Sequence, residues 1–152
     1  GCSPGFRSDT IQTMKLELDS LELAVSKLHR SVDTSRRYMN DSDADLTETV
    51  RAGVIQHFEV AYELCWKFIQ RWLKENRPDF ETDLPRTRRD LFRDAARAGL
   101  VADPAPWFSF ADSRNLTSHT YDVSRAEQGF ETAVSFLSHA EGLLASLRNH
   151  ND

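Results

Sequence analysis

The sequence predicts an all-helical protein, an antiparallel up-and-down bundle of four main helices and one short helix. Apolar residues recur at steps of three and four along most of the chain, and no segment alternates apolar and polar residues for long. The 152 residues suffice for one domain with its own core. The composition, 39% hydrophobic and 28% charged, excludes collagen-like and disordered proteins.

The first helix follows a segment of different composition. Residues 1–13 mix Gly, Pro, Ser and Thr, and we interpret them as a vector-derived or disordered leader before one helical-bundle domain over residues 14–152. Asp19, with Glu22 three positions later, matches a capping box and predicts the start of the helix. The turn-forming sequence Asn-Asp-Ser-Asp predicts its end near Asn40.

The second helix, expected over residues 47–76, is the most apolar stretch of the chain. One face would consist of Val54, Phe58, Ala61, Tyr62, Cys65, Ile69 and Trp72. Four more apolar residues widen this face beyond that of an ordinary surface helix: Val60, Leu64, Phe68 and Leu73. Such a helix is either central in the bundle or shared with a second subunit, and its surplus of apolar surface leads us to predict a homodimer.

The third helix is expected over residues 84–98, with Gly99 as the glycine that follows its last turn. It would bury Leu84, Leu91, Phe92 and Ala95. Asp103 and Pro104 then predict the N-cap and the first residue of a short fourth helix. That helix should end or distort within residues 114–122, where Asn, Thr and Ser side chains compete for backbone hydrogen bonds.

The last helix should open with a second capping box, formed by Ser124 and Glu127. Its apolar residues alternate in steps of four and three: Ala126, Phe130, Ala133, Leu137, Ala140, Leu144 and Leu147.

The charge and the cysteines exclude several classes of protein. The net charge of -5 leaves no basic field over the whole molecule, so nucleic acid would have to bind a local patch. No apolar run reaches the roughly 18 residues that a membrane span needs. Cys2 and Cys65 do not make a disulfide framework, and Cys65, in an apolar stripe, is expected to be a buried free thiol. Without a signal peptide, we expect a cytoplasmic protein.

The segment from Arg114 to Tyr121 holds the most informative side chains, because His119 follows Arg114 by five positions and precedes Tyr121 by two. On an unbroken helix His119 would point about 140° away from Arg114, so the three converge only if the helix ends or distorts. Arginine can hold a phosphate with two hydrogen bonds, and histidine can transfer a proton near neutral pH. Together they are the minimum for metal-free cleavage of RNA by its own 2′-hydroxyl group.

A structural alternative fits the same residues. The segment can be a helix terminus with Asn115 as a capping residue, His119 on the surface and Tyr121 packed against the fourth helix. The spacing alone favours this alternative, because an arginine and a histidine five positions apart often occur by chance.

A row of arginines lies along one side of the predicted third helix. Arg86, Arg89, Arg93 and Arg97 repeat at three- and four-residue steps and could contact RNA phosphates or an acidic partner, although a solvated helix face is the commoner outcome.

The predicted second helix carries a histidine and two carboxylates that might suggest a metal site: His57, Glu59 and Glu63. They lack the pair of histidines four positions apart that zinc-binding helices use, so we expect no metal ion and no cofactor. A packed or interfacial His57 and surface ion pairs of the two glutamates with the basic side chains that follow explain these residues.

Four segments match a known pattern: LDSLELAVSKL, QHFEVAYELCWKFIQRWL, WFSFADSRNLTSHTYD and, more weakly, RDLFRDAARAGLVAD. On these segments the chain resembles the HepT and nucleotidyltransferase substrate-binding group within the HEPN class of helical proteins. The resemblance covers essentially everything from Met14 to the last helix. Its two patterns, FE-x2-YEL-x-WK and W-x6-RN-x3-H-x-Y, are specific when they occur together.

The resemblance implies a helical homodimer encoded beside a minimal nucleotidyltransferase. In HepT-type toxins the arginine and histidine of this motif form a metal-independent ribonuclease site from both subunits, and the partner silences the toxin by adenylylating the tyrosine. By this resemblance Arg114 and His119 are catalytic, Asn115 is a supporting polar group, and Tyr121 is the modified residue. The alternatives are a non-catalytic substrate-binding subunit of the nucleotidyltransferase, or a purely structural dimer module.

Overall fold

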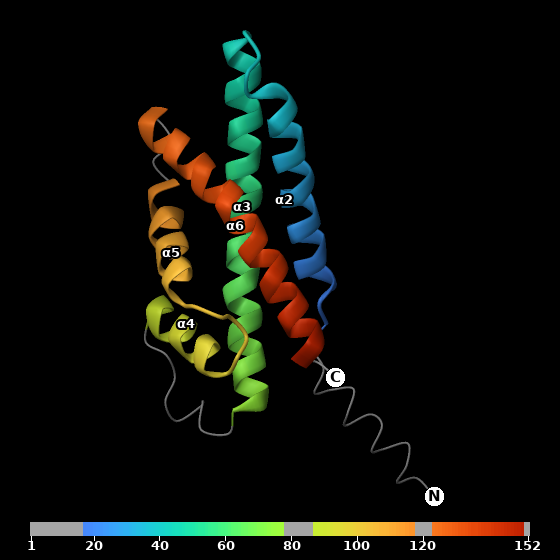
Figure 1. Cartoon of the computed structure of the whole chain (residues 1–152), viewed down its shortest axis with the longest axis vertical. Coiled ribbons are helices and arrows are strands. Elements are labelled where there is room, and N and C mark those ends of the chain that lie inside the picture. The colour runs from blue at the N-terminus through green and yellow to red at the C-terminus, as the bar shows by residue number, and fades with distance from the viewer. Residues whose placement is uncertain (1–16, 78–86, 118–122, 151–152) are drawn as a thin grey trace, which may run out of the picture.

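A computed structural model describes residues 17–77, 87–117 and 123–150, and for residues 115–117 and 123 the backbone alone. These residues form five helices (Figure 1): α2 (Asp19–Tyr38), α3 (Ala44–Asn76), α4 (Arg88–Arg97), α5 (Ala105–Thr117) and α6 (Val123–His150). No β-strand occurs within these ranges, and the predicted all-helical bundle is confirmed. The leader predicted at residues 1–13 lies outside the described residues.

Helix α3 is the centre of the bundle and contacts α2, α4, α5 and α6. In Figure 1, α2 runs antiparallel along one side of α3, α6 crosses α3 obliquely, and α4 and α5 lie on the side away from α2. All seven residues of the predicted apolar face are buried. Of the four that widen it, Phe68 and Leu73 are buried, Leu64 is half-buried and Val60 is 48% exposed. The central place of α3 therefore explains most of its apolar breadth, and the homodimer stays a prediction.

Two helices, α2 and α6, begin before the predicted capping residues can act as caps. Helix α2 already includes Asp19, and Leu18 before it makes no side-chain capping bond, so the predicted Asp19 cap is wrong. From within the first turn, Asp19 and Glu22 still act favourably on the positive end of the helix dipole. Helix α6 includes Val123, which places Ser124 inside the helix and not before it.

Side-chain caps set the starts of α3 and α4, and in both places the prediction was wrong by several residues. The Asp43 carboxylate accepts hydrogen bonds from the backbone N–H groups of Asp45 and Leu46, so α3 begins at Ala44 and not near residue 47. The Thr87 hydroxyl oxygen accepts from the N–H of Asp90, so α4 begins at Arg88. The backbone of Thr87 is extended, so a helix predicted from residue 84 does not run unbroken into α4, while residues 84–86 themselves lie outside the described residues.

The connection from α4 to α5 follows the predicted chemistry. Gly99 has a φ of 84°, and the N–H groups of Gly99 and Leu100 donate to the carbonyls of Ala96 and Ala95, as in a Schellman motif. The Asp103 carboxylate accepts from the N–H of Ala105 at 3.0 Å, as a helix cap does. Because α5 begins at Ala105, the proline before it is not the first helical residue, which corrects the prediction by one position.

An aromatic cluster fixes α4 and α5 against α3 and α6. Its members lie edge-to-face or tilted, with ring centroids 5.0 to 6.3 Å apart: Phe58, Tyr62, Phe92, Trp107, Phe110 and Phe136. Cys65 nearby is a fully buried free thiol, as predicted, and burial raises its pKa. Each helix within the described ranges is too short or too polar to act as a membrane span.

Candidate functional site

Arg114 lies in the last turn of α5 and reaches across to α3. Its Nη1 atom is 2.9 Å from Oε2 of Glu59, and its Nε atom is 3.8 Å from Oε1 of Glu63. The two glutamates are four positions apart and therefore project from the same face of α3. The Arg114 side chain is 30% exposed, so two carboxylates hold the guanidinium at the boundary between core and solvent.

The contacts continue from Glu63 to α4. The indole Nε1 of Trp66 donates to Oε2 of Glu63 at 3.0 Å, and the guanidinium carbon of Arg88 lies 3.2 Å from the centre of the Trp66 ring. Beneath them, burial raises the pKa of Tyr62 to about 12, although the charge of Arg88 and a hydrogen bond from it act in the opposite direction. A chain of contacts thus runs from Arg114 of α5 through Glu63 and Trp66 of α3 to Arg88 of α4. The Tyr62 phenol stays protonated at neutral pH.

The role predicted for the two glutamates requires a correction. We expected Glu59 and Glu63 to pair along the surface of their own helix with the lysine and arginine that follow, but both contact Arg114 of α5. Lys67 and Arg71 instead lie over the rings of Trp66 and Phe68. The sequence signal that was available is the placement of two acids, four positions apart, in the most apolar stretch of the helix.

His57 lies two residues before Glu59 on α3, about half a helical turn, so it projects from a different face of the helix, toward α2. It is half-buried, in line with the predicted packing. Burial, and then the charges of Lys27 and Arg30 on α2, lower its pKa. Within the described part of the chain no group of three or more His, Cys, Asp or Glu residues is arranged to hold a metal ion.

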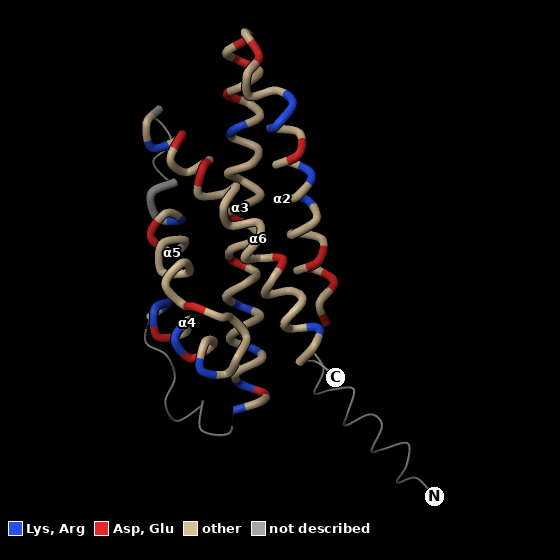
Figure 2. The backbone as a smooth tube through the Cα atoms, viewed as in Figure 1, with Lys and Arg blue, Asp and Glu red and all other residues tan. Residues whose placement is uncertain are grey.

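The arginine row on α4 is matched by acids. Arg89 contacts Asp112 of α5 at 3.3 Å. Arg93 and Arg97 each contact an aspartate three positions earlier on α4, at 3.1 and 2.8 Å. Figure 2 shows the two kinds of charge interleaved along α4.

Two of these arginines also lie over an aromatic ring, because the guanidinium carbons of Arg89 and Arg93 are 4.9 and 5.2 Å from the centre of Phe108. The described part of the row is therefore a charge-compensated surface, and its contact with RNA or an acidic partner stays a prediction. The first member, Arg86, lies outside the described residues.

The rest of the predicted site is not described. His119 and Tyr121 lie within residues 118–122, and only the backbone of Asn115 is described, inside α5. Helix α5 continues to Thr117, so it does not end at Arg114. The predicted convergence of Arg114, His119 and Tyr121 stays a prediction.

Comparison with known proteins gives three results. Residues 16–149 match the family model described as nucleotidyltransferase substrate binding protein like. A relative from Haemophilus influenzae named probable ribonuclease HepT is 33% identical over 143 residues, which are 93% of this chain and 98% of the relative. A solved structure from Haemophilus influenzae is described as having the fold of a substrate binding domain of a nucleotidyltransferase. It is 32% identical and has a TM-score of 0.79 over 87% of this chain and 99% of that chain.

Proposed function

Because the chain belongs to the family of nucleotidyltransferase substrate binding protein-like proteins, we propose that it is the HepT-like component of a two-gene module of the toxin–antitoxin type. The second gene would encode a minimal nucleotidyltransferase. By itself the chain would be a homodimeric, metal-independent endoribonuclease that acts in the cytoplasm. The observation on which the proposal rests is the 33% identity, along almost the whole chain, with a probable ribonuclease.

The geometry of Arg114 supports a phosphate-binding role. The guanidinium is held by Glu59 and Glu63 at the edge of the core, where its orientation is constrained before any ligand arrives. A charged group that is already oriented loses less conformational freedom when it binds a phosphate. At this position Arg114 would bind the scissile phosphate and stabilise the negative charge that develops on its non-bridging oxygens.

His119 would move the protons of the reaction. As general base it would accept the proton of the ribose 2′-hydroxyl while the 2′-oxygen bonds to phosphorus and the bond from phosphorus to the 5′-oxygen breaks. His119, protonated in this way, would then donate a proton to the leaving 5′-oxygen. The products would be a 2′,3′-cyclic phosphate and a 5′-hydroxyl, and Asn115 would support the bound phosphate as a further polar group.

Tyr121 would be the residue on which the partner enzyme acts. The phenolic oxygen would attack the α-phosphorus of ATP, pyrophosphate would leave, and an AMP group would remain bonded to the tyrosine. The added negative charge would lie two residues from His119 and compete with RNA for Arg114. This modification would silence the ribonuclease.

Expression in cells tests the module. The chain alone should arrest growth, whereas Arg114→Ala and His119→Ala should not, and co-expression with the neighbouring nucleotidyltransferase should restore growth. Intact mass spectrometry of the co-expressed chain should show AMP added, and Tyr121→Phe should abolish the addition. An unchanged mass, or an addition that persists in Tyr121→Phe, would show that Tyr121 is not the modified residue.

A non-catalytic substrate-binding subunit is the second candidate function. The observation in its favour is the solved neighbour described as having the fold of a nucleotidyltransferase substrate binding domain. The charge-compensated surface of α4 also offers RNA less attraction than a free row of arginines would. In that case the chain alone would leave growth and RNA intact and would instead raise the activity of its partner.

A further inference from the structure

Trp66 of α3 lies between the contacts of Arg114 and the first turn of α4. Its indole Nε1 donates a hydrogen bond to Oε2 of Glu63 at 3.0 Å, and the other oxygen of the same carboxylate, Oε1, is 3.8 Å from Nε of Arg114. The two oxygens of one carboxylate therefore have different partners. Because they belong to one planar group, a bond that fixes one oxygen also restricts the position of the other.

The indole ring that makes this bond is itself held from the side of α4. The guanidinium carbon of Arg88, the first residue of α4, lies 3.2 Å from the centre of the half-buried Trp66 ring. Arg88 also donates a hydrogen bond to the hydroxyl oxygen of Tyr62, which is only 2% exposed. A cation stacked on an indole is an attractive contact, and an indole has only two side-chain torsions to fix. The donor of the Glu63 bond thus takes its position without any ligand.

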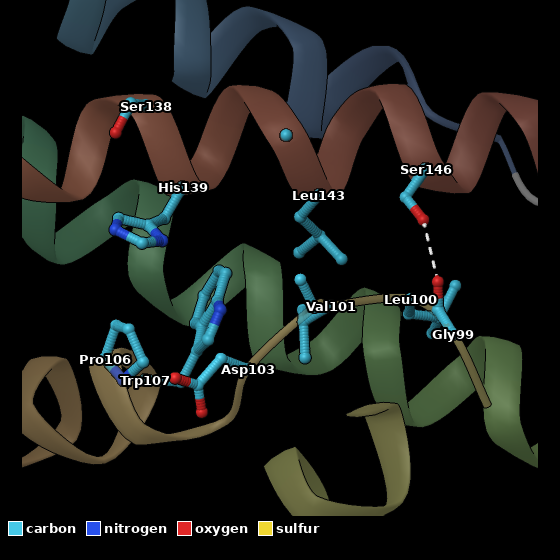
Figure 3. Close-up of a pocket in the computed structure, with 12 residues that line it drawn as sticks. Gly99, Leu100, Val101, Asp103, Pro106, Trp107, Ser138, His139, Leu143 and Ser146 are labelled. Carbon is cyan, nitrogen blue, oxygen red and sulfur yellow. Dashed lines mark hydrogen bonds between the residues drawn. The ribbon is translucent and has the colours of Figure 1, made fainter. Parts of the chain in front are cut away.

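The backbone that carries Arg114 is fixed at the opposite end of α5. Trp107, in the first turn, is 2% exposed, and its ring lies edge-on to the ring of His139 on α6, with centroids 6.5 Å apart (Figure 3). A long arginine side chain on a fixed helix still has several torsions of its own. The orientation of the Arg114 guanidinium therefore depends on its contacts with Glu59 and Glu63.

The two glutamates contact Arg114 in different ways. Glu59 forms a close ion pair, with its Oε2 atom 2.9 Å from Nη1, whereas the contact of Glu63 is 3.8 Å long and its side chain is 37% exposed. A long, partly solvated ion pair is a weak restraint on a flexible side chain. The bond from Trp66 to the Glu63 carboxylate is charge-assisted and therefore stronger than a neutral hydrogen bond. It supplies the restraint that the long ion pair lacks.

These contacts also explain a motif that the proposed reaction does not use. The pattern FE-x2-YEL-x-WK on α3 includes Glu59, Glu63 and Trp66. Steps of four and three place the three side chains on one side of the helix, and two of them contact Arg114, which belongs to the second pattern of the sequence. The first pattern thus supports the arginine of the second.

We propose that Trp66 is a positioning residue of the site: its indole N–H fixes the Glu63 carboxylate, which in turn orients the guanidinium of Arg114 toward the phosphate. The proposal rests on the ribonuclease function proposed above and adds a residue that acts through Glu63. Misplacing an active-site group by about 1 Å can cost about 10²-fold in rate, so losing one restraint should lower kcat roughly tenfold. Because Arg114 keeps its charge, the KM for RNA should stay within about twofold of the wild-type value.

The restraint on Arg114 is measured without RNA, from the exchange of its Nε–H with water in NMR spectra of the ¹⁵N-labelled full chain. Arg114→Lys has no Nε atom and assigns the signal. Trp66→Phe removes the donor but keeps an aromatic ring for Arg88, and it should speed the exchange at least about threefold. Trp72→Phe is the matched control on the same helix, because the Trp72 indole N–H has no acceptor among the described residues. It should leave the exchange unchanged.

Two further backgrounds show through which residue Trp66 acts. In Glu63→Ala the carboxylate is absent, so the addition of Trp66→Phe should change neither the exchange nor kcat. In Glu59→Ala the same addition should still speed the exchange and lower kcat. A tryptophan that only stabilised the fold would have equal effects in both backgrounds. Thermal melting checks folding, and Trp66→Met replaces Trp66→Phe if the latter does not fold.

The proposal is overturned if Trp66→Phe matches the wild type in exchange or in kcat, or if Trp72→Phe has the same effect. It is also overturned if the effect of Trp66→Phe persists in Glu63→Ala. A wild-type chain that leaves RNA intact would instead contradict the proposed ribonuclease. The exchange measurement in the same variants then decides by itself whether Trp66 positions Arg114.

Discussion

The two ends of α5 differ in kind. At its last turn, Arg114 is held by Glu59 and Glu63 at a half-buried, charged contact with α3. At its first turn, Trp107 is 2% exposed and packs among aromatic rings of α4 and α6. The first contact constrains a charge that can act on a ligand, and the second fixes the helix in the core. The comparison teaches that one short helix can be anchored in the core at one end and hold a half-exposed charge at the other.

The largest expected effect is a difference in the free energy of unfolding between substitutions at the two ends of α5. Trp107→Ala should lower the free energy of unfolding by about 3–5 kcal/mol, because a large ring leaves a closely packed site. Arg114→Ala should lower it by only about 1 kcal/mol or less, since the ion pairs are partly solvated. Urea denaturation of both variants measures the difference. Equal losses at the two ends would contradict this division of α5.

A smaller effect should appear when the charge around Arg114 is changed. Glu59→Gln keeps a hydrogen-bond acceptor but removes one negative charge near Arg114, the proposed phosphate-binding group, which is worth about 1 kcal/mol. The KM for RNA should therefore fall several-fold, with kcat nearly unchanged. Glu59→Ala removes the constraint on Arg114 as well and should lower kcat. If both variants leave KM and kcat as they are, Glu59 does not act through Arg114.

Gly99 and Gly142 should respond to substitution by alanine in opposite directions. Gly99→Ala should cost about 1–2 kcal/mol, because Gly99 has a φ of 84° that other residues adopt with strain. Gly142→Ala should add up to about 1 kcal/mol, because helix propensity improves and no atom obstructs the new Cβ. Differential scanning calorimetry measures both. A destabilised Gly142→Ala would contradict the open space that surrounds this position.

The smallest effect concerns pH. Burial lowers the pKa of His57 below its usual value of about 6.5, so the unfolded chain binds a proton there more readily than the folded chain. The stability that the neutral form of His57 contributes is present above pH of about 6.5 and is lost as the pH falls toward the folded pKa. In His57→Gln the free energy of unfolding should fall less between pH 7 and pH 5. A slope equal to that of the wild type would contradict this assignment.

The sequence predicted those parts of the fold that depend on local chemistry. Periodicity or a single residue type was enough to predict four features: the helical bundle, the buried face of α3, the free thiol of Cys65 and the termination of α4 by Gly99. The predicted starts of α3 and α4 were wrong because Asp43 and Thr87 cap these helices. Local sequence patterns do not show which of several nearby residues will cap a helix.

The tertiary contacts at the two ends of α5 could not be predicted from the sequence. The motif predicts a site role for Arg114, which stays a prediction, but the contact with Glu59 and Glu63 joins positions far apart in the chain, and no spacing encodes it. At the other end, the ring contacts of Trp107 with Phe92 of α4 and Phe136 of α6 likewise depend on the tertiary fold, which local patterns do not encode.

The central claim is that the Arg114 end of α5 belongs to a metal-independent ribonuclease site, and RNA cleavage by the purified chain tests it most directly. Wild type, Arg114→Ala, His119→Ala and the double variant are compared in EDTA, with circular dichroism to confirm folding. We predict cleavage by the wild type to 2′,3′-cyclic phosphate ends and losses of about 10²-fold or more in each single variant. The double variant should be little worse than either, because residues of one catalytic unit are not additive. Cleavage that survives in His119→Ala, or that EDTA abolishes in the wild type, would contradict the claim.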